Sequence, residues 1–335
     1  MPYYYKKKQR FVDATFCSTK SSAPPTPAIE KVLNLYTPSF YLDLGNICNL
    51  SCIYCCVDRT SLYTSRIEDL IEVARLAKDR GFKNVVLIGG EPTIHKGFFR
   101  LLSALKELGF EKSVLTTNGL LLASKAFLKN VVEYGVRTIH LSLDDFDEQT
   151  LSLLSRNPST YPLVVKALRN ILETPEINVY VYTVVTKLNI AHLRQYAQEV
   201  ARLDDQKGRL SIVFAGVKPV ARALENAKTV VPRATESANA IREALKEAIS
   251  LGVGAMHKNC QPCLLPDLLS FDLDAFLEEV RVDLETGKIE RSQMPKGHVK
   301  AEQCKRCFLN HVCGGVHENY VKLYGLDEFR PIEKI

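Results

Sequence analysis

Apolar and amphipathic segments alternate over most of the chain. Six short runs are almost continuously apolar, and each is followed by a longer run with apolar residues at helical spacing. Strands buried on both faces show such apolar runs, and parallel strands need helical crossovers between them. The pattern therefore predicts six β-then-α units, with strands in the runs 39–45, 84–90, 112–119, 138–145, 178–187 and 209–217.

Six such units indicate an α/β fold and leave two architectures open. Eight units close a full barrel, so six predict either a partial barrel or an open doubly wound sheet. In both architectures the active site lies beyond the C-terminal ends of the strands. The polar segments that follow the six runs are therefore expected to meet around one site.

Composition narrows the compartment and the partners. The 335 residues are 46% hydrophobic and 24% charged, as in ordinary globular proteins. A signal-peptide pattern and an apolar run of about 20 residues are both missing, so we expect a cytoplasmic protein without membrane contact. The net charge of +6 is dispersed, and its compact basic run at 6–10 is interpreted as a solvated terminus. No nucleic-acid partner is expected.

Four cysteines stand within nine residues in the segment CNLSCIYCC, directly after the first apolar run. Cytosolic thiols stay reduced, so clustered cysteines favour ligands over disulfides. Cys48, Cys52 and Cys55 form a CxxxCxxC motif with three thiolates on one short loop. Structural zinc prefers four protein ligands, whereas three thiolates suit an iron–sulfur cluster with one open iron. Cys56 is interpreted as a small buried thiol.

The CxxxCxxC motif and the GGEP segment at 89–92, after the second strand, together resemble the radical S-adenosylmethionine (SAM) superfamily over residues 38–250. The resemblance implies a partial (β/α)6 barrel over 38–252, preceded by a polar leader at 1–37 and followed by a small cysteine-rich extension at 253–335. It also implies a 4Fe–4S cluster on Cys48, Cys52 and Cys55, with SAM bound to the open iron.

The same resemblance assigns SAM-binding roles to single residues. Tyr54 would lie against the adenine. Arg156 resembles an arginine that clamps the SAM carboxylate, with a solvated helix end as the alternative interpretation. Gly89, Gly90 and Glu91 would meet the SAM amino group. Asn118 and Ser142, polar residues at strand ends, would also contact SAM.

A second concentration of cysteines lies near the C-terminus and resembles the SPASM and twitch extensions of radical SAM enzymes. It contains Cys260, Cys263, Cys304, Cys307 and Cys313. Five cysteines suffice for one auxiliary 4Fe–4S cluster, expected on Cys304, Cys307, Cys313 and one of the pair Cys260 and Cys263. A structural zinc site with four thiolates fits the ligand count equally well. His257, His311 and His317 are interpreted as surface or capping residues.

The resemblance implies an enzyme that receives an electron from flavodoxin or ferredoxin, cleaves SAM to a 5'-deoxyadenosyl radical and abstracts hydrogen from its substrate. The first hypothesis is modification of a peptide or protein side chain; the alternatives are small-molecule biosynthesis and a non-catalytic metal-binding scaffold. Several strand-end residues are candidates for facing the substrate, with local hydrogen bonding as the alternative: Asp144, Asp145, Tyr182, Thr186, Lys187, Lys218 and Arg222.

Overall fold

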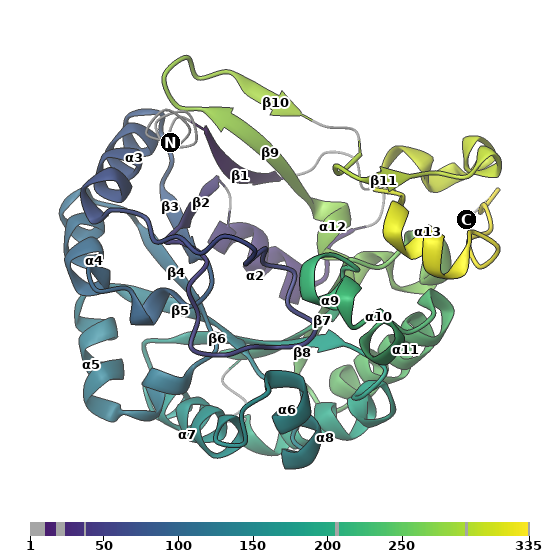
Figure 1. Cartoon of the computed structure of the whole chain (residues 1–335), viewed down its shortest axis with the longest axis horizontal. Coiled ribbons are helices and arrows are strands. Elements are labelled where there is room, and N and C mark those ends of the chain that lie inside the picture. Colours follow the sequence, from purple (N-terminus) through teal and green to yellow (C-terminus); the bar gives the residue numbers. More distant parts are fainter. Residues whose placement is uncertain (1–10, 18–23, 37, 205–207, 292–293, 334–335) are drawn as a thin grey trace.

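A ten-stranded sheet forms the centre of the computed structural model, which describes residues 11–17, 24–36, 38–204, 208–291 and 294–333. The strand order is β10-β9-β1-β2-β3-β4-β5-β6-β7-β8. Neighbouring strands from β2 to β8 run parallel, and the curved sheet forms an incomplete barrel with helices outside (Figure 1). The parallel strands are β2 (Ser39–Asp43), β3 (Asn84–Ile88), β4 (Lys112–Thr117), β5 (Val136–Ser142), β6 (Asn178–Val185), β7 (Leu210–Gly216) and β8 (Gly254–Lys258).

The partial barrel and its six predicted strands are confirmed. Five of the six strands end two or three residues before the predicted runs do, and β7 ends one residue before, so the last residues of those runs belong to the loops that follow them. β8 is a seventh parallel strand, although its residues were expected in the C-terminal extension. It pairs with β7 from Ser211 and Gly254 to Ala215 and Lys258, and so continues the barrel wall.

Helices cover the outer face of the sheet. In α4, for example, Phe98, Leu101, Leu102 and Leu105 are buried at helical spacing against the strands. The crossover helices are α3 (Ile67–Asp79), α4 (Phe98–Glu107), α5 (Lys125–Glu133), α6 (Glu148–Ser155), α7 (Thr160–Leu172), α8 (Leu193–Leu203), α9 (Ala221–Glu225), α10 (Ala227–Val230) and α11 (Ala234–Ser250). Short 3-10 turns precede several of them: η1 (Pro92–Ile94), η2 (Leu120–Ala123) and η3 (Ile190–His192).

A smaller apolar cluster fills the barrel interior and closes the end at which the strands begin. Val86, Val114 and Val213 of the strands pack with Ile29 of α2 (Pro27–Tyr36) and Phe276 of α12 (Leu273–Phe276). The α2 side chain of Lys31 donates to the Gly208 carbonyl beside the start of β7, so α2 covers the N-terminal ends of the strands. Figure 1 shows α2 inside the ring of strands. The open end of the barrel is therefore the one where the strands end.

The N-terminal segment differs from the expected polar leader because residues 11–17 form β1 (Phe11–Cys17). This strand lies antiparallel between β2 and β9 (Leu277–Asp283), where Ala14 pairs with Phe40 on one side and Val280 on the other. Val12, Ala14 and Thr15 are buried, whereas Asp13 is exposed. Residues 1–10, with the basic run at 6–10, and 18–23 lie outside the described residues.

The C-terminal part adds a hairpin strand, a two-stranded sheet and a closing helix. β10 (Ile289–Arg291) pairs with β9, and β11 (His298–Val299) pairs with β12 (Val316–His317). The remaining elements are η4 (Pro262–Leu264), η5 (Pro266–Phe271), η6 (Glu302–Arg306), η7 (Phe308–His311) and α13 (Glu318–Tyr324). Across the described ranges, every helix is too short or too polar to span a lipid bilayer.

Candidate functional site

The loop that carries Cys48, Cys52 and Cys55 leaves the C-terminal end of β2 and is closed by a buried asparagine. Asn46 Nδ2 donates to the carbonyls of Asp58 and Ser61, both at 2.8 Å, and its Oδ1 accepts from the Tyr63 amide at 2.8 Å. Arg59 Nη1 donates to the Leu50 carbonyl at 2.9 Å. One side chain thus joins the entry and exit of the loop, which holds the three cysteines at the barrel mouth.

The three thiols are partly buried and lie close enough to influence one another. Burial, together with the nearby Asp144, Cys55 and Cys48, raises the pKa of Cys52 to about 12. Thiols in such surroundings become thiolates when a cation binds them, because a coordinating metal deprotonates its thiol ligands. The set therefore fits a metal or cluster ligand group and does not fit a free nucleophile.

Gly89 and Gly90 allow the segment after β3 to press against the cysteine loop. The Gly90 amide donates to the Gly45 carbonyl at 2.7 Å, and the Glu91 amide donates to the Ile47 carbonyl at 2.9 Å. A Cβ on Gly89 would lie 2.4 Å from the Gly45 oxygen, and one on Gly90 2.3 Å from the Ile47 oxygen. The sequence predicts close backbone approach at these glycines, and in the structure the approaching partner is the backbone that leads into Cys48.

The Glu91 carboxylate is buried and accepts four hydrogen bonds from the protein. Oε1 accepts from the Thr93 amide at 3.1 Å and from the hydroxyls of Thr93 and Thr117, both at 2.6 Å. Oε2 accepts from the Asn118 amide at 2.7 Å. Burial raises the pKa of Glu91, and the four donors oppose that shift. Glu91 therefore ties η1 to the end of β4, and only Oε2 retains capacity for a ligand.

Tyr54 connects the cysteine loop to the ends of β5 and β6. Its hydroxyl donates to the Asp144 carboxylate, whose Oδ1 also accepts from the Val184 amide at 2.9 Å. Burial raises the pKa of Asp144 to about 6. The tyrosine expected to lie against adenine is thus fixed by its hydroxyl, which leaves the ring as the part that can meet a ligand.

The structure distributes the other expected SAM-binding residues unevenly. The Asn118 side chain lies beside the cysteine loop, with Nδ2 2.7 Å from Asn49 Oδ1 and 3.8 Å from Cys48 Sγ. Ser142 ends β5 at the barrel mouth. Arg156 is exposed and caps α6 with a left-handed backbone, φ 55°. It is close to the loop through the backbone, because the amide of Ile53 donates to the neighbouring Leu154 carbonyl at 2.9 Å.

Most strand-end residues that were candidates for substrate contact make local bonds instead. Asp145 lies 2.7 Å from His192 Nδ1, and Thr186 Oγ1 donates to Asn189 at 2.9 Å. Lys187 Nζ donates to the Lys228 carbonyl at 3.0 Å. Arg222 is different: its Nη1 is buried and has no hydrogen-bond partner among the described residues, and the guanidinium acts on the pKa of Cys55.

The C-terminal cysteines form a second group that contains Cys263 but not Cys260. Burial, together with the neighbouring thiols of Cys313, Cys307 and Cys304, raises the pKa of Cys263 to about 12. Cys260 has Asp272 and Asp274 as its charged neighbours instead, and its Sγ lies 3.5 Å from the Lys258 carbonyl. The two cysteines of the CQPC segment therefore face different surroundings.

Neither thiol group has the close spacing of a single-ion site. Within the described part of the chain, no three or more His, Cys, Asp or Glu side chains come together tightly enough to hold one metal ion. A polynuclear cluster binds each thiolate through a different iron, so its ligands stand further apart than those of one zinc ion.

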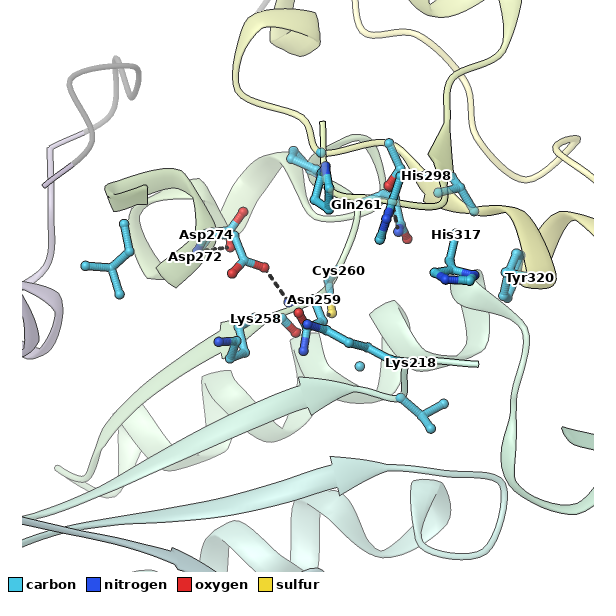
Figure 2. A pocket seen from close by; sticks show the side chains of 18 of the residues that line it. Lys218, Lys258, Asn259, Cys260, Gln261, Asp272, Asp274, His298, His317 and Tyr320 are labelled. Carbon is cyan, nitrogen blue, oxygen red and sulfur yellow. Dashed lines mark hydrogen bonds between the residues drawn. The ribbon is translucent and has the colours of Figure 1, made fainter. Parts of the chain in front are cut away.

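A cavity of about 880 Å³ opens between the barrel mouth and the C-terminal extension. Figure 2 shows Lys218, Lys258, Asn259 and Cys260 from the ends of β7 and β8 on one side, and His298, His317 and Tyr320 on the other. An apolar cluster beside it contains Ile53 of the cysteine loop and, at its edge, Cys263. The cavity thus lies next to the packing that connects the two thiol groups. The lining from the C-terminal extension was not accessible to sequence reasoning.

Comparison with known proteins gives a family match and two kinds of relatives. Residues 42–200 match the family model described as the radical SAM superfamily. Probable GTP 3',8-cyclases are similar: one from Saccharolobus islandicus (strain M.14.25 / Kamchatka #1) is 28% identical over 173 residues, which is 51% of this chain and 53% of that protein. One from Sulfurisphaera tokodaii is 27% identical over 152 residues, 45% of this chain and 48% of that protein. The chain spans about half the length of the curated relatives it matches.

Two solved structures share the fold at low sequence identity. SuiB of Streptococcus suis, bound to the precursor peptide SuiA, has a TM-score of 0.55 at 19% identity and covers 68% of this chain and 50% of its own. The FeFe-hydrogenase maturase HydG from Carboxydothermus hydrogenoformans has a TM-score of 0.51 at 14% identity and covers 70% of this chain and 56% of its own. At these identities the likeness establishes the fold.

Proposed function

We propose that the chain, whose residues 42–200 match the radical SAM superfamily, cleaves SAM reductively to abstract hydrogen from a substrate held in the cavity. A 4Fe–4S cluster and SAM are the cofactors of this family. The proposal rests mainly on the CxxxCxxC loop at the barrel mouth. Its three thiols lie together there, and its backbone contacts the GGEP segment.

Each part of the first site has a role in this proposal. Cys48, Cys52 and Cys55 would hold the cluster, and Tyr54 and Glu91 would fix the two segments that enclose SAM. Arg222 would pair with the SAM carboxylate, because its buried Nη1 lacks a protein acceptor among the described residues. When bound, the cluster and SAM supply an electron and a 5'-deoxyadenosyl radical. The electron would come from a flavodoxin or ferredoxin in the cytoplasm.

The C-terminal group would hold an auxiliary 4Fe–4S cluster through Cys263, Cys304, Cys307 and Cys313. The other three thiols raise the pKa of Cys263, and this electrostatic proximity supports the ligand set. Cys260 lines the cavity and has carboxylates as its charged neighbours, so it stays outside the set. A structural zinc site would use the same four thiols, and measured metal content separates the two.

The cavity favours a compact polar substrate. Its volume of about 880 Å³ lies within the range of pockets that enclose small molecules. Lysine, histidine, asparagine and glutamine side chains line it, which suits a molecule with several hydrogen-bonding groups. The relatives that carry the name GTP 3',8-cyclase support the same class, because that name specifies a small-molecule substrate.

A peptide is the second candidate, and one feature of the sheet favours it. β10 is an edge strand, and its Glu290 lines the cavity. An extended peptide could pair with this edge and place one side chain in the cavity, as in other cases of strand addition. SuiB, which shares the fold, is named for its complex with a precursor peptide.

Metal content and SAM cleavage test the proposal together. Iron, sulfide and zinc are measured on anaerobically isolated wild type, on Cys52→Ala and on a Cys304→Ala, Cys307→Ala, Cys313→Ala triple variant, and 5'-deoxyadenosine is quantified after reduction. We expect about eight irons in the wild type and about four in the triple variant. Cys52→Ala should form no 5'-deoxyadenosine. Continued cleavage by Cys52→Ala would contradict the assignment, and absence of cleavage by the wild type would leave a non-catalytic scaffold.

Two further outcomes separate the remaining alternatives. About four irons in both the wild type and the triple variant, with zinc lost from the variant, would make the C-terminal site structural. For the substrate, 5'-deoxyadenosine formation is compared with and without GTP as the first probe. Stimulation by GTP supports a compact substrate, whereas stimulation by a peptide but not by GTP would favour the second candidate.

A further inference from the structure

One end of the cavity is lined by three basic side chains from separate segments. Lys218 follows β7, His298 lies in β11 and His317 lies in β12. The two strands pair so that His298 and His317 stand opposite each other, with ring centroids 5.2 Å apart. Figure 2 shows Lys218 on the strand side of the cavity and both imidazoles on the side of the C-terminal extension. We call these three residues the basic end of the cavity.

No ion pair within the described ranges neutralises the positive charge of Lys218 at the basic end. Lys218 makes no salt bridge with any residue in the described ranges. Burial lowers the pKa of His298 and of His317, and the charge of Lys218 lowers both further, whereas Asp274 and Glu318 act in the opposite direction. Basic groups that disfavour one another's charged forms are stabilised when an anion binds between them.

The hydrogen bond that His317 accepts determines which of its ring nitrogens is a donor toward the cavity. Nδ1 accepts from the Asn319 amide at 3.1 Å, so the neutral ring carries its proton on Nε2. A Cβ at position 297 would lie 3.2 Å from Nε2, and Gly297 adopts a φ of 77°. Glycine therefore leaves room beside the Nε2–H group, which a larger residue would crowd.

We propose that the basic end binds an anionic group of the substrate, a carboxylate or a phosphate. This inference rests on the proposed function, since it takes the cavity as the substrate site. Lys218 supplies the charge and His317 a directional donor, which together recognise an oxyanion. Asp274 also lines the cavity and repels such a group, so the anionic end of a substrate is expected at the basic end and not beside Asp274.

Direct binding tests this inference without SAM chemistry. Inorganic pyrophosphate and succinate are titrated calorimetrically into the iron-loaded protein at matched ionic strength, with sodium chloride as the reference titrant. The variant Lys218→Met removes the charge at the basic end, and Lys218→Arg restores it. Lys228→Met is the matched control, because Lys228 is exposed on α10 and does not line the cavity.

We expect saturable binding of one probe, weakened about tenfold or more by Lys218→Met and unchanged by Lys228→Met. Binding of pyrophosphate identifies a phosphate group, and binding of succinate identifies a carboxylate. If neither probe binds saturably, or if Lys218→Met binds as the wild type does, the inference is wrong. Its failure is distinguishable from failure of the proposed function, because 5'-deoxyadenosine formation is measured separately and needs no substrate anion.

Discussion

At the scale of single residues, the two arginines near the first site have different surroundings. Arg222 has a buried Nη1 without a hydrogen-bond partner in the described part of the chain, and it lies within electrostatic reach of Cys55. Arg156 is exposed and ends α6. A buried guanidinium nitrogen without an acceptor is costly, and an anion bound at Arg222 Nη1 would remove that cost. The structure thus favours Arg222 for the carboxylate contact that the sequence motif suggests for Arg156.

Replacement of each arginine by methionine separates the two assignments. We expect Arg222→Met to raise the KM for SAM about tenfold or more, since a charged hydrogen bond to the carboxylate is lost. Arg156→Met should change that KM by less than about twofold, because an exposed charge contributes little. The measurement is the rate of 5'-deoxyadenosine formation at varied SAM concentration. A larger effect of Arg156→Met would return the contact to Arg156.

Residue-level prediction from the sequence groups residues by their spacing, but it cannot make choices that need the fold. The motif spacing places Cys48, Cys52 and Cys55 on one loop, and the structure brings their thiols together. Cys260 and Cys263, by contrast, are three positions apart in one segment, and nothing in that spacing tells them apart. Only the arrangement of η4 against the C-terminal turns shows that Cys263 meets the other thiols.

At the scale of elements, β1 connects β2 of the barrel to β9 of the C-terminal hairpin. Ala14 is fully buried between Phe40 of β2 and Val280 of β9. We expect Ala14→Asp to lower the free energy of unfolding by about 3 kcal/mol or more, because it buries an unpaired carboxylate. Thermal unfolding followed by circular dichroism measures the effect. Thr286→Asp is the control, since Thr286 is exposed beyond β9, and an equal loss there would argue against the pairing.

The sequence predicts repeating elements better than single ones. Six apolar runs followed by helical patterns give the six units, because each run is long enough to distinguish from chance. β1 is hard to recognise in the sequence because its alternating residues, Val12, Ala14 and Phe16, stand in a polar region and pair with β9 far along the chain. β8 is equally hard to recognise, since its five residues GAMHK include a buried histidine and end in a lysine. Both β1 and β8 are determined by pairing with other strands, which the local sequence does not show.

At the scale of the whole molecule, buried histidines link stability to pH. Burial lowers the pKa of His257 to about 4 and that of His140 to about 3, both from an ordinary value of 6.5. Between these values and 6.5 the unfolded chain binds more protons than the folded protein, so stability falls as the pH falls. The slope is about 1.4 kcal/mol per pH unit for each histidine.

We therefore expect the thermal midpoint of the wild type to fall relative to that of His257→Gln between pH 6.5 and pH 4, since the buried acids are the same in both proteins. Differential scanning calorimetry across this range measures it. His311 is exposed, so His311→Gln is the matched control and should leave the slope as it is in the wild type. A difference between the wild type and His257→Gln that stays constant over the range would show that His257 is not buried in its neutral form.

The pairing of β1 with β9 also orders the events of folding. Phe11 pairs with Asp283, so a strand synthesised before the barrel must wait for one synthesised after it. Contacts between such distant segments form slowly, because a long loop has to close before they can form. The barrel units can assemble during synthesis, while the sheet edge beside β2 stays open until the C-terminal hairpin arrives. A chain truncated before β9 would expose that edge and tend to aggregate.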